Sequence, residues 1–286
     1  MLEARFASTF SPMRFGNDDS DRGNVEDARG IGGSGIGGIH LGIGGIIIVG
    51  ILSMVFRTNL FALLGGGGQT TQAPASSQQV AERKQAESGL EQVAVAAFND
   101  TQHFWARTLP GKWSDAKLVL YWDEVQSGCG DAQSAMGPFY CSPDKRIYID
   151  LGFYRELAQR FGAPGQFAQA YVIAHEMGHH VQDELGIMAH AVRDPANSVK
   201  LELQADCLAG VWGHDAAARN LLDPGEAEQG LRAAASVGDD RLQKMAGRRV
   251  NPETFTHGSA EQRSHWFGVG MQSGKWQDCD TFHAAQ

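Results

Sequence analysis

The chain has 286 residues, 42% of them hydrophobic, with 36 glycines and a formal net charge of −9. This length allows one large domain or two small ones and is ample for a hydrophobic core. The acidic balance argues against a nucleic-acid-binding protein, which normally presents a basic face.

The first 86 residues differ in composition from the rest. Residues 1–30 are charged, lack periodicity and lack a signal-peptide n-region, so we expect a disordered tail. Residues 31–64 form a glycine-rich, apolar segment in which residues 31–56 carry no Asp, Glu, Lys or Arg. Because about 20 apolar residues cross a bilayer, this segment predicts one transmembrane helix. The Gly-, Gln- and Ser-rich residues 65–86 predict a flexible linker.

Two other interpretations of residues 31–64 stay open. The segment could be a low-complexity linker with an apolar end, or a cleaved signal peptide with an unusually long leader. Arg29 lies before the apolar run and Arg57 follows it. The distribution of positive charge therefore does not orient a membrane helix.

Residues 87–286 predict a mostly helical α+β domain with a small sheet. The patterns favour strands at 117–123 and 146–150, helices at 87–108, 152–162, 166–185 and 201–212, and one or two helices at 224–246. Ser259 could cap a last helix. We expect the strand at 146–150 to be a sheet edge that could pair with an extended peptide.

The helix at 166–185 contains the motif His-Glu-x-x-His. His175 and His179 are four residues apart, so on a helix both imidazoles share one face and can take two corners of a tetrahedral zinc site. Glu176 is rotated about 100° from His175, which suits a carboxylate that takes a proton from the zinc-bound water as general base. His180 points about 140° away from His175. We therefore interpret His180 as a packing or hydrogen-bonding residue and not as a ligand.

Glu202 and Asp206 supply carboxylates with the same four-residue spacing. Such a pair is most often an exposed acidic face, but the surrounding residues are apolar and small, which implies burial. Buried carboxylates are costly without a partner. Glu202 as the third zinc ligand and Asp206 as acceptor of an imidazole N–H would meet that need.

These blocks, together with the stretch from Thr256 to Arg263, resemble the bacterial neutral zinc metallopeptidase family, a group of membrane-anchored glutamate-type zincins. The resemblance covers the chain from about residue 87 to the C-terminus and the position of the anchor. It implies a zincin-like domain with one Zn²⁺, bound by His175, His179 and Glu202. It also implies that Glu176 is the catalytic acid/base and that Asp206 supports a ligand.

His257 lies in the expected loop before the last helix. A loop histidine could reach the reacting carbonyl as an electrophile. It could equally be a structural histidine with its hydrogen bonds satisfied. The sequence carries no geometry that separates these alternatives.

Four cysteines lie in the domain, and none forms a Cys-x-x-Cys motif, which speaks against a disulfide exchanger. The simplest of the three possible pairings is Cys129 with Cys141 and Cys207 with Cys279. Disulfides would place the domain in an oxidising compartment, whereas four reduced thiols would indicate a cytosolic protein.

We therefore expect a single-pass membrane protein with a periplasmic or extracytoplasmic catalytic domain and a cytoplasmic N-terminus. Its activity would be zinc-dependent hydrolysis of peptide or protein substrates, with the cytoplasmic membrane bound through the N-terminal anchor and no nucleic-acid partner. The alternative is a non-catalytic envelope binding or scaffolding module with a structural zinc. Glu176 counts against that alternative, because a structural site has no use for it.

Overall fold

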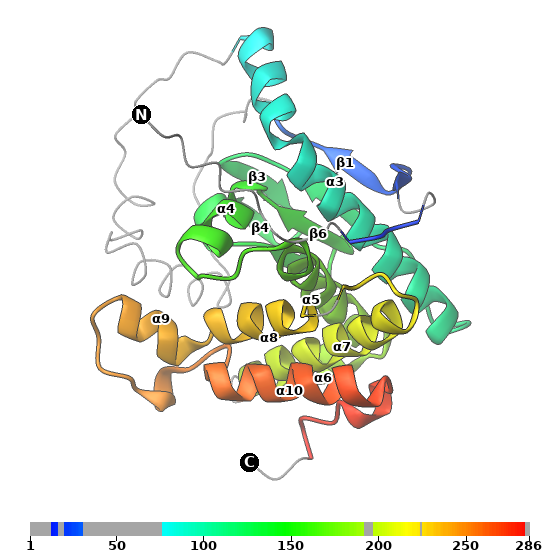
Figure 1. Ribbon diagram of the computed structural model, residues 1–286, viewed down its shortest axis with the longest axis vertical. Coiled ribbons are helices and arrows are strands. Elements are labelled where there is room, and N and C mark those ends of the chain that lie inside the picture. The colour runs from blue at the N-terminus through cyan, green and yellow to red at the C-terminus, as the bar shows by residue number, and fades with distance from the viewer. Residues whose placement is uncertain (1–12, 17–19, 31–75, 192–196, 224, 284–286) are drawn as a thin grey trace.

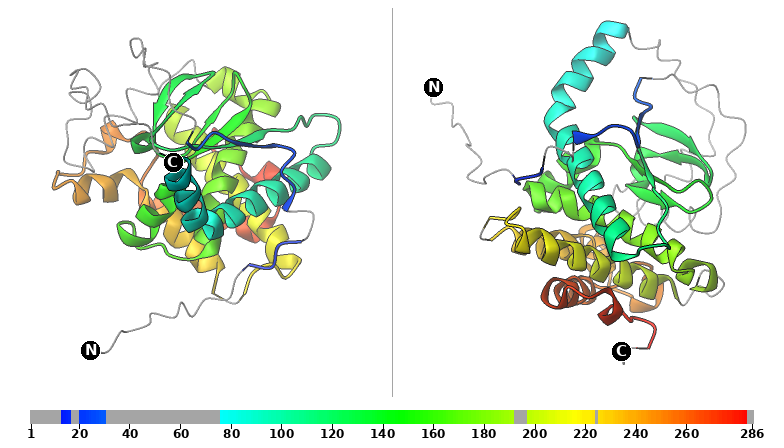
Figure 2. Two further views of the ribbon diagram at one scale, coloured as in Figure 1. Left: turned by 90° about the horizontal axis from the view of Figure 1, so that it is seen from above. Right: turned by 90° about the vertical axis from the view of Figure 1, so that its right-hand side faces the viewer.

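A computed structural model of the chain describes residues 13–16, 20–30, 76–191, 197–223 and 225–283. These residues form a mostly helical α+β fold with a small sheet, as the sequence predicts. In Figure 1 the strands lie in the upper half and the C-terminal helices in the lower half, with helix α5 (Gln166–Glu184) between them. Figure 2 shows from the side that the last helix lies on the outer face of the helical half.

The main sheet has four strands in the order β1-β2-β6-β5. They are β1 (Val25–Asp27), β2 (Lys117–Leu120), β6 (Arg146–Ile149) and β5 (Phe139–Cys141). The first three are parallel, whereas β5 is antiparallel to β6. Strands β2 and β6 are central and largely buried, which explains their continuous apolar sequences. A separate hairpin joins β3 (Glu124–Ser127) to β4 (Gly130–Gln133) and leads through the short helix η2 (Ser134–Met136) to β5.

The sheet edge differs from the sequence-based expectation. The strand at 146–150 corresponds to β6, which pairs with β2 on one side and β5 on the other and is therefore not an edge. Among the described residues, the edges are β1 and β5, and β5 is the edge strand beside β6. Its three residues are too few for the pattern of residue types to identify a strand.

The N-terminal segment also differs from the expected tail. Residues Val25–Asp27 form β1, in register with Leu118, Val119 and Leu120 of β2. Met13 is part of the hydrophobic core. The boundary between tail and domain therefore does not fall at residue 87, because parts of residues 13–30 belong to the folded unit.

Helix α3 (Ser77–Thr108) begins within the expected flexible linker of residues 65–86. Ser76 explains the start: its side chain accepts a hydrogen bond from the backbone N–H of Gln79, and the Gln79 side chain accepts one from the backbone N–H of Ser76. This reciprocal cap satisfies two backbone donors that a helix end leaves without intrahelical partners. Because residues 65–86 are mostly polar, their composition did not indicate that a helix begins among them.

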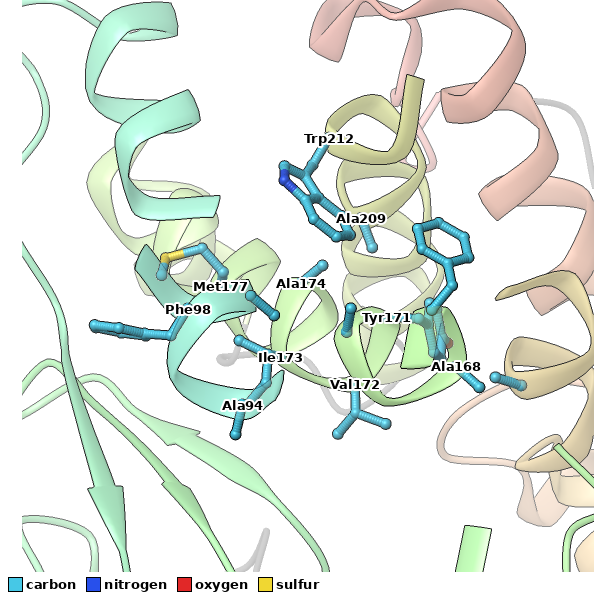
Figure 3. Packing of buried hydrophobic residues seen from close by; sticks show 14 of the residues in the cluster. Ala94, Phe98, Ala168, Tyr171, Val172, Ile173, Ala174, Met177, Ala209 and Trp212 are labelled. Atoms are coloured by element: carbon cyan, nitrogen blue, oxygen red, sulfur yellow. The ribbon is translucent and has the colours of Figure 1, made fainter. Parts of the chain in front are cut away.

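Helix α5 forms where the sequence predicts it. Gly165 precedes it with φ 117°, and Gly186 follows it with φ 74°, so glycine occupies both turns that L side chains disfavour. Figure 3 shows its apolar side chains, such as Ala174 and Met177, packed between Phe98 of α3 and Trp212 of α7 (Ser198–Ala218). The motif helix is thus held on two sides by buried apolar contacts.

Shorter helices complete the fold. They are α4 (Gly152–Gln159), α6 (Ile187–Ala191), α8 (Ala227–Ser236), α9 (Asp239–Met245), α10 (Ala260–Ser273) and the 3-10 turns η4 (Pro252–Thr254) and η5 (Trp276–Asp278). The expected helical segment at 224–246 is divided into α8 and α9. Ser259 caps α10 as predicted, accepting from the backbone N–H of Gln262.

Helices α7 and α10 approach so closely that glycine is needed on both. A Cβ added to Gly210 of α7 would lie 2.2 Å from the carbonyl oxygen of Phe267, and one added to Gly270 of α10 would lie 2.0 Å from that of Cys207. Neither carbonyl can move without breaking its helix. This contact fixes the position of α10 beside the metal-binding motif.

Both predicted disulfides are present. Cys129 pairs with Cys141, tying the β3–β4 hairpin to β5, and Cys207 pairs with Cys279, tying α7 to the C-terminal segment. No cysteine is free.

The predicted transmembrane helix at residues 31–64 lies outside the described residues. Within the described parts of the chain, no helix has the length and apolar character needed to cross a membrane.

The α7–α10 contact yields a paired test of stability on one helix. Gly270→Ala should lower the free energy of unfolding by about 1–3 kcal/mol, because its methyl group meets backbone. Gly268→Ala, whose Cβ would have Leu231 no closer than 4.0 Å, should raise it by about 0.5–1 kcal/mol through helix propensity. Urea denaturation would measure both. Equal midpoints for the two variants would contradict the close contact.

Candidate metal centre

Helices α5 and α7 bring the three predicted ligands together. Glu202 Oε2 lies 3.2 Å from His175 Nε2, and Glu202 Oε1 lies 3.5 Å from His179 Nε2. One ligand atom from each of the three residues lies within 4.8 Å of the others. Ligand atoms about 2.0–2.2 Å from a tetrahedral zinc are roughly 3.3–3.6 Å apart. Both His–Glu distances are close to this spacing, so the three residues could hold a zinc ion.

The other ring nitrogen of each histidine is held by a polar side chain. His175 Nδ1 lies 2.9 Å from Asp206 Oδ1, and His179 Nδ1 lies 2.9 Å from Gln182 Oε1. Because both partners are acceptors, each imidazole donates its Nδ1–H and keeps an Nε2 lone pair for a metal. Asp206 thus has the supporting position that the sequence predicts.

Asp206 is fully buried and binds more than the histidine. Arg263 of α10 donates to Asp206 Oδ2 from Nε at 2.7 Å and to Oδ1 from Nη2 at 2.9 Å, and the Tyr171 hydroxyl also donates to Oδ1. Burial would raise the pKa of Asp206, but Arg263 and His175 outweigh it and lower that pKa. Burial likewise opposes the charge on Arg263, and Asp206 raises its pKa. Carboxylate and guanidinium are therefore both ionised.

A chain of side-chain amides supports His179. Gln182 Nε2 donates to the Leu201 carbonyl at 2.7 Å and to Gln204 Oε1 at 3.1 Å, and Gln204 Nε2 donates to the Cys279 carbonyl at 2.9 Å. Gln182 is fully buried. The orientation of the His179 ring is thus connected to the segment that the Cys207–Cys279 disulfide holds in place.

As expected, His180 is not grouped with the three candidate ligands and instead forms hydrogen bonds with other parts of the fold. Its Nδ1 lies 2.9 Å from the Tyr140 hydroxyl of β5, and its Nε2 lies 2.7 Å from the Ser114 carbonyl. Burial lowers its pKa. Asp183 also accepts from Tyr140, at 2.9 Å. These contacts attach the edge strand β5 to the motif helix.

His257 lies on the wall of the same cavity as the ligands. Asp239 holds its loop: Oδ2 accepts from the backbone N–H of Thr256, His257 and Gly258 at 2.7, 2.7 and 3.1 Å, while Oδ1 lies 3.3 Å from His257 Nδ1. Burial opposes protonation of His257, but Asp239 and Glu202 raise its pKa. The geometry therefore places a readily protonated imidazole at the site.

The cavity beside the ligands has a volume of about 450 Å³. Glu176 lines it together with the three ligands, and its side chain is buried except at this wall. Roughly 300–1,000 Å³ is typical of a pocket that encloses a small ligand or a peptide side chain. The metal centre thus opens onto a space where a substrate can bind.

The neighbouring charges shift the pKa values of two of the three ligands. Burial would lower the pKa of His175, but Asp206 and Glu202 raise it to about 10. Burial would raise the pKa of Glu202, whereas the histidines hold it well below its usual range. At neutral pH a metal must therefore displace the proton from His175, while Glu202 is already ionised.

Sequence reasoning missed several residues that shape the site. Arg263, Tyr171, Gln182 and Asp239 each hold a functional side chain or its loop. Arg263 is the last residue of a stretch that carries the family resemblance. The sequence therefore pointed to this residue but did not indicate what it does. The other three are single polar residues in ordinary helical contexts.

Asp206→Asn tests the support of the metal ligand. Loss of the negative charge leaves Arg263 buried without its counter-charge and weakens the hold on His175, so zinc affinity should fall about 10–100-fold. His175→Ala and Glu202→Ala should lose the metal. Competition with a chromophoric chelator would measure each affinity. Asp278→Asn, at an exposed position, is the matched control; affinity equal to this control would refute the role of Asp206.

Comparisons with known proteins agree with a zinc-binding site. The chain is 40% identical over 283 residues to "Uncharacterized protein YpfJ" of Escherichia coli (strain K12), covering 93% of this chain and 97% of that protein. It is 44% identical over 206 residues to "Uncharacterized protein Mb2605" of Mycobacterium bovis, covering 67% of this chain and 70% of that protein. No solved structure shows a significant match. The model of the family described as "Putative neutral zinc metallopeptidase" matches residues 13–282, and the chain belongs to this family.

Proposed function

We propose that the chain is a zinc-dependent metalloendopeptidase that hydrolyses peptide bonds in peptide or protein substrates. The observation that carries this proposal is the combination of three protein ligands with an open cavity lined by Glu176. Zinc sites that serve only a structural role are usually closed by four protein ligands, whereas catalytic sites keep one position free. The family description supports the same chemistry.

His175, His179 and Glu202 would hold the zinc. When bound, zinc supplies Lewis acidity that polarises a carbonyl and lowers the pKa of a water toward about 7. Glu176, one residue after the first ligand on α5, accepts the proton of the attacking water and passes it to the leaving amine. A protonated His257 donates a hydrogen bond to the oxygen on which negative charge develops.

Strand β5 would bind the substrate backbone. Phe139 and Tyr140 of this strand line the cavity, and among the described residues β5 pairs with β6 alone. An extended peptide can add to such an edge through main-chain hydrogen bonds. Tyr140 keeps the strand at a fixed distance from α5 through His180 and Asp183.

The domain would function outside the cytoplasm, attached to the cytoplasmic membrane through residues 31–64. Two disulfides and the absence of a free cysteine support the first part, since disulfides persist in oxidising compartments. The apolar sequence supports the second part. The acidic balance supports the proposal that no nucleic acid is bound.

Glu176→Gln separates catalysis from zinc binding. This variant should keep the zinc and lose peptide hydrolysis by about 10²–10⁴-fold, because it removes the general base. Metal analysis and hydrolysis of a broad fluorogenic peptide library would measure both quantities on the full chain. If wild type and variant both retain zinc and neither cleaves any peptide, the protein is a binding or scaffolding module with a structural zinc.

A further inference from the structure

The cavity at the metal centre is apolar except at the centre itself. Its uncharged walls come from three directions: Phe153 and Leu157 on α4, Val237 and Leu242 at α8 and α9, and Met136 and Phe139 around β5. The lining residues with carboxylate, imidazole or guanidinium groups are His175, Glu176, His179, Glu202, His257 and Arg263, which all belong to the site already described.

We infer that this cavity receives a large apolar side chain, aliphatic or aromatic, from the residue next to the scissile bond. This inference rests on the proposed peptidase function and specifies its substrate class. Burial of apolar surface against these walls is favourable in proportion to its area. A charged substrate side chain would lose its hydration without meeting an opposite charge on the cavity walls away from the metal centre. The walls therefore select for apolar and against charged residues.

Binding and cleavage of matched peptides test this inference separately. The peptides form sets that differ at one position beside the scissile bond, carrying Phe, Leu, Ala, Asp or Lys. The full chain with Glu176→Gln, loaded with zinc, should bind the Phe and Leu peptides about 10–200-fold more tightly than the Ala peptide and the charged peptides more weakly still. With wild type, kcat/KM should follow the same order.

A paired substitution locates the effect in the cavity. Val237→Phe should fill part of it, so affinity for the Phe peptide should fall at least tenfold while affinity for the Ala peptide changes little. Val269→Phe, at a position of similar partial exposure on α10 away from the cavity, should change neither.

The two outcomes against the proposals differ. If wild type cleaves peptides with no preference for apolar residues beside the scissile bond, the inference about the cavity is overturned and the peptidase function stays intact. Selective binding by Glu176→Gln with no cleavage by wild type would uphold the binding site and defeat the peptidase proposal.

A second, independent observation concerns the membrane. Residues on both sides of the apolar segment belong to one folded unit: β1 pairs with β2, the Leu118 N–H donates to the Asn24 carbonyl at 2.9 Å, and the Ala28 N–H donates to the Leu120 carbonyl at 2.8 Å. Asn99 of α3 also donates to the Asp21 carbonyl, at 2.6 Å. These main-chain contacts extend over most of residues 21–28.

Arg29 fixes the end of this segment against α3. Its side chain is 1% exposed and pairs with Asp27 at 2.9 Å and with Glu91 of α3 at 2.5 Å, with Glu87 at 3.5 Å. A buried guanidinium requires such partners. A Cβ on Gly30 would lie 2.7 Å from Val80, one helical turn from the start of α3. Gly30, the last described residue before residues 31–75, therefore lies beside the first turn of α3, which follows them.

We propose that residues 20–30 and helix α3 lie on the same side of any membrane that the chain binds. The single crossing that the sequence predicts would put β1 and α3 on opposite sides and remove β1 from the sheet. It would also leave Arg29, Glu87 and Glu91 without their shared ion pairs. The chain would then cross that bilayer an even number of times or not at all, and its N-terminal segment would not be cytoplasmic when the disulfide-bonded domain is outside.

Labelling in intact bacterial spheroplasts tests this topology. Ser20→Cys and Gln78→Cys place one exposed thiol on each side of residues 31–75 in the full chain. A membrane-impermeant maleimide should label both variants to the same extent before lysis, while a cytoplasmic thiol protein stays unlabelled until lysis. Labelling of Gln78→Cys alone before lysis would establish a single crossing and overturn the proposal.

Discussion

The buried carboxylate of Asp206 holds three helices and one metal ligand in a single arrangement. It belongs to α7, accepts hydrogen bonds from His175 and Tyr171 of α5, and pairs in a bidentate manner with Arg263 of α10. Removing one partner of a buried ion pair typically costs about 3–5 kcal/mol, because the other charge is left uncompensated. The orientation of His175 therefore depends on Arg263, which lies 88 positions further along the chain.

That dependence explains why α7 and α10 must be so close. The guanidinium of Arg263 reaches Asp206 only because Gly210 and Gly270 let the two backbones touch. On the next turn of α7, the Cys207–Cys279 disulfide ties the C-terminal segment to the same helix, and the Cys279 carbonyl accepts from Gln204. Helix α7 thus takes part in the backbone contact, the ion pair, the disulfide and the amide chain. Both candidate ligand histidines, His175 and His179, are supported through contacts with this helix.

The features predictable from sequence are those encoded in helical spacing. His175, His179, Glu202 and Asp206 could be assigned because residues four apart share a helix face, and Ser259 because a cap is a local signal. Arg263 and Asp239 could not be assigned in the same way, because each acts through a contact with a distant segment that spacing does not encode. Gln182 lies three positions after His179 on the same helix, but a glutamine at that spacing is too common to indicate a role. Strand β1 was not predicted for a related reason. Its three residues show no period, and its pairing with β2 spans more than ninety positions of sequence. The edge strand β5 was missed likewise, and the more regular β6 was mistaken for the edge.

The way the site is stabilised without metal bears on its use. Asp206 neutralises Arg263, the Gln182 amide holds His179, and a proton on His175, whose pKa is about 10, balances the Glu202 carboxylate. The two histidines are therefore oriented by protein side chains. Domains that use zinc to fold have the opposite design, because their ligands come together only when the ion is bound. Ligands that the protein itself orients beside an open cavity suit the proposed hydrolysis, which requires a free fourth position on the metal.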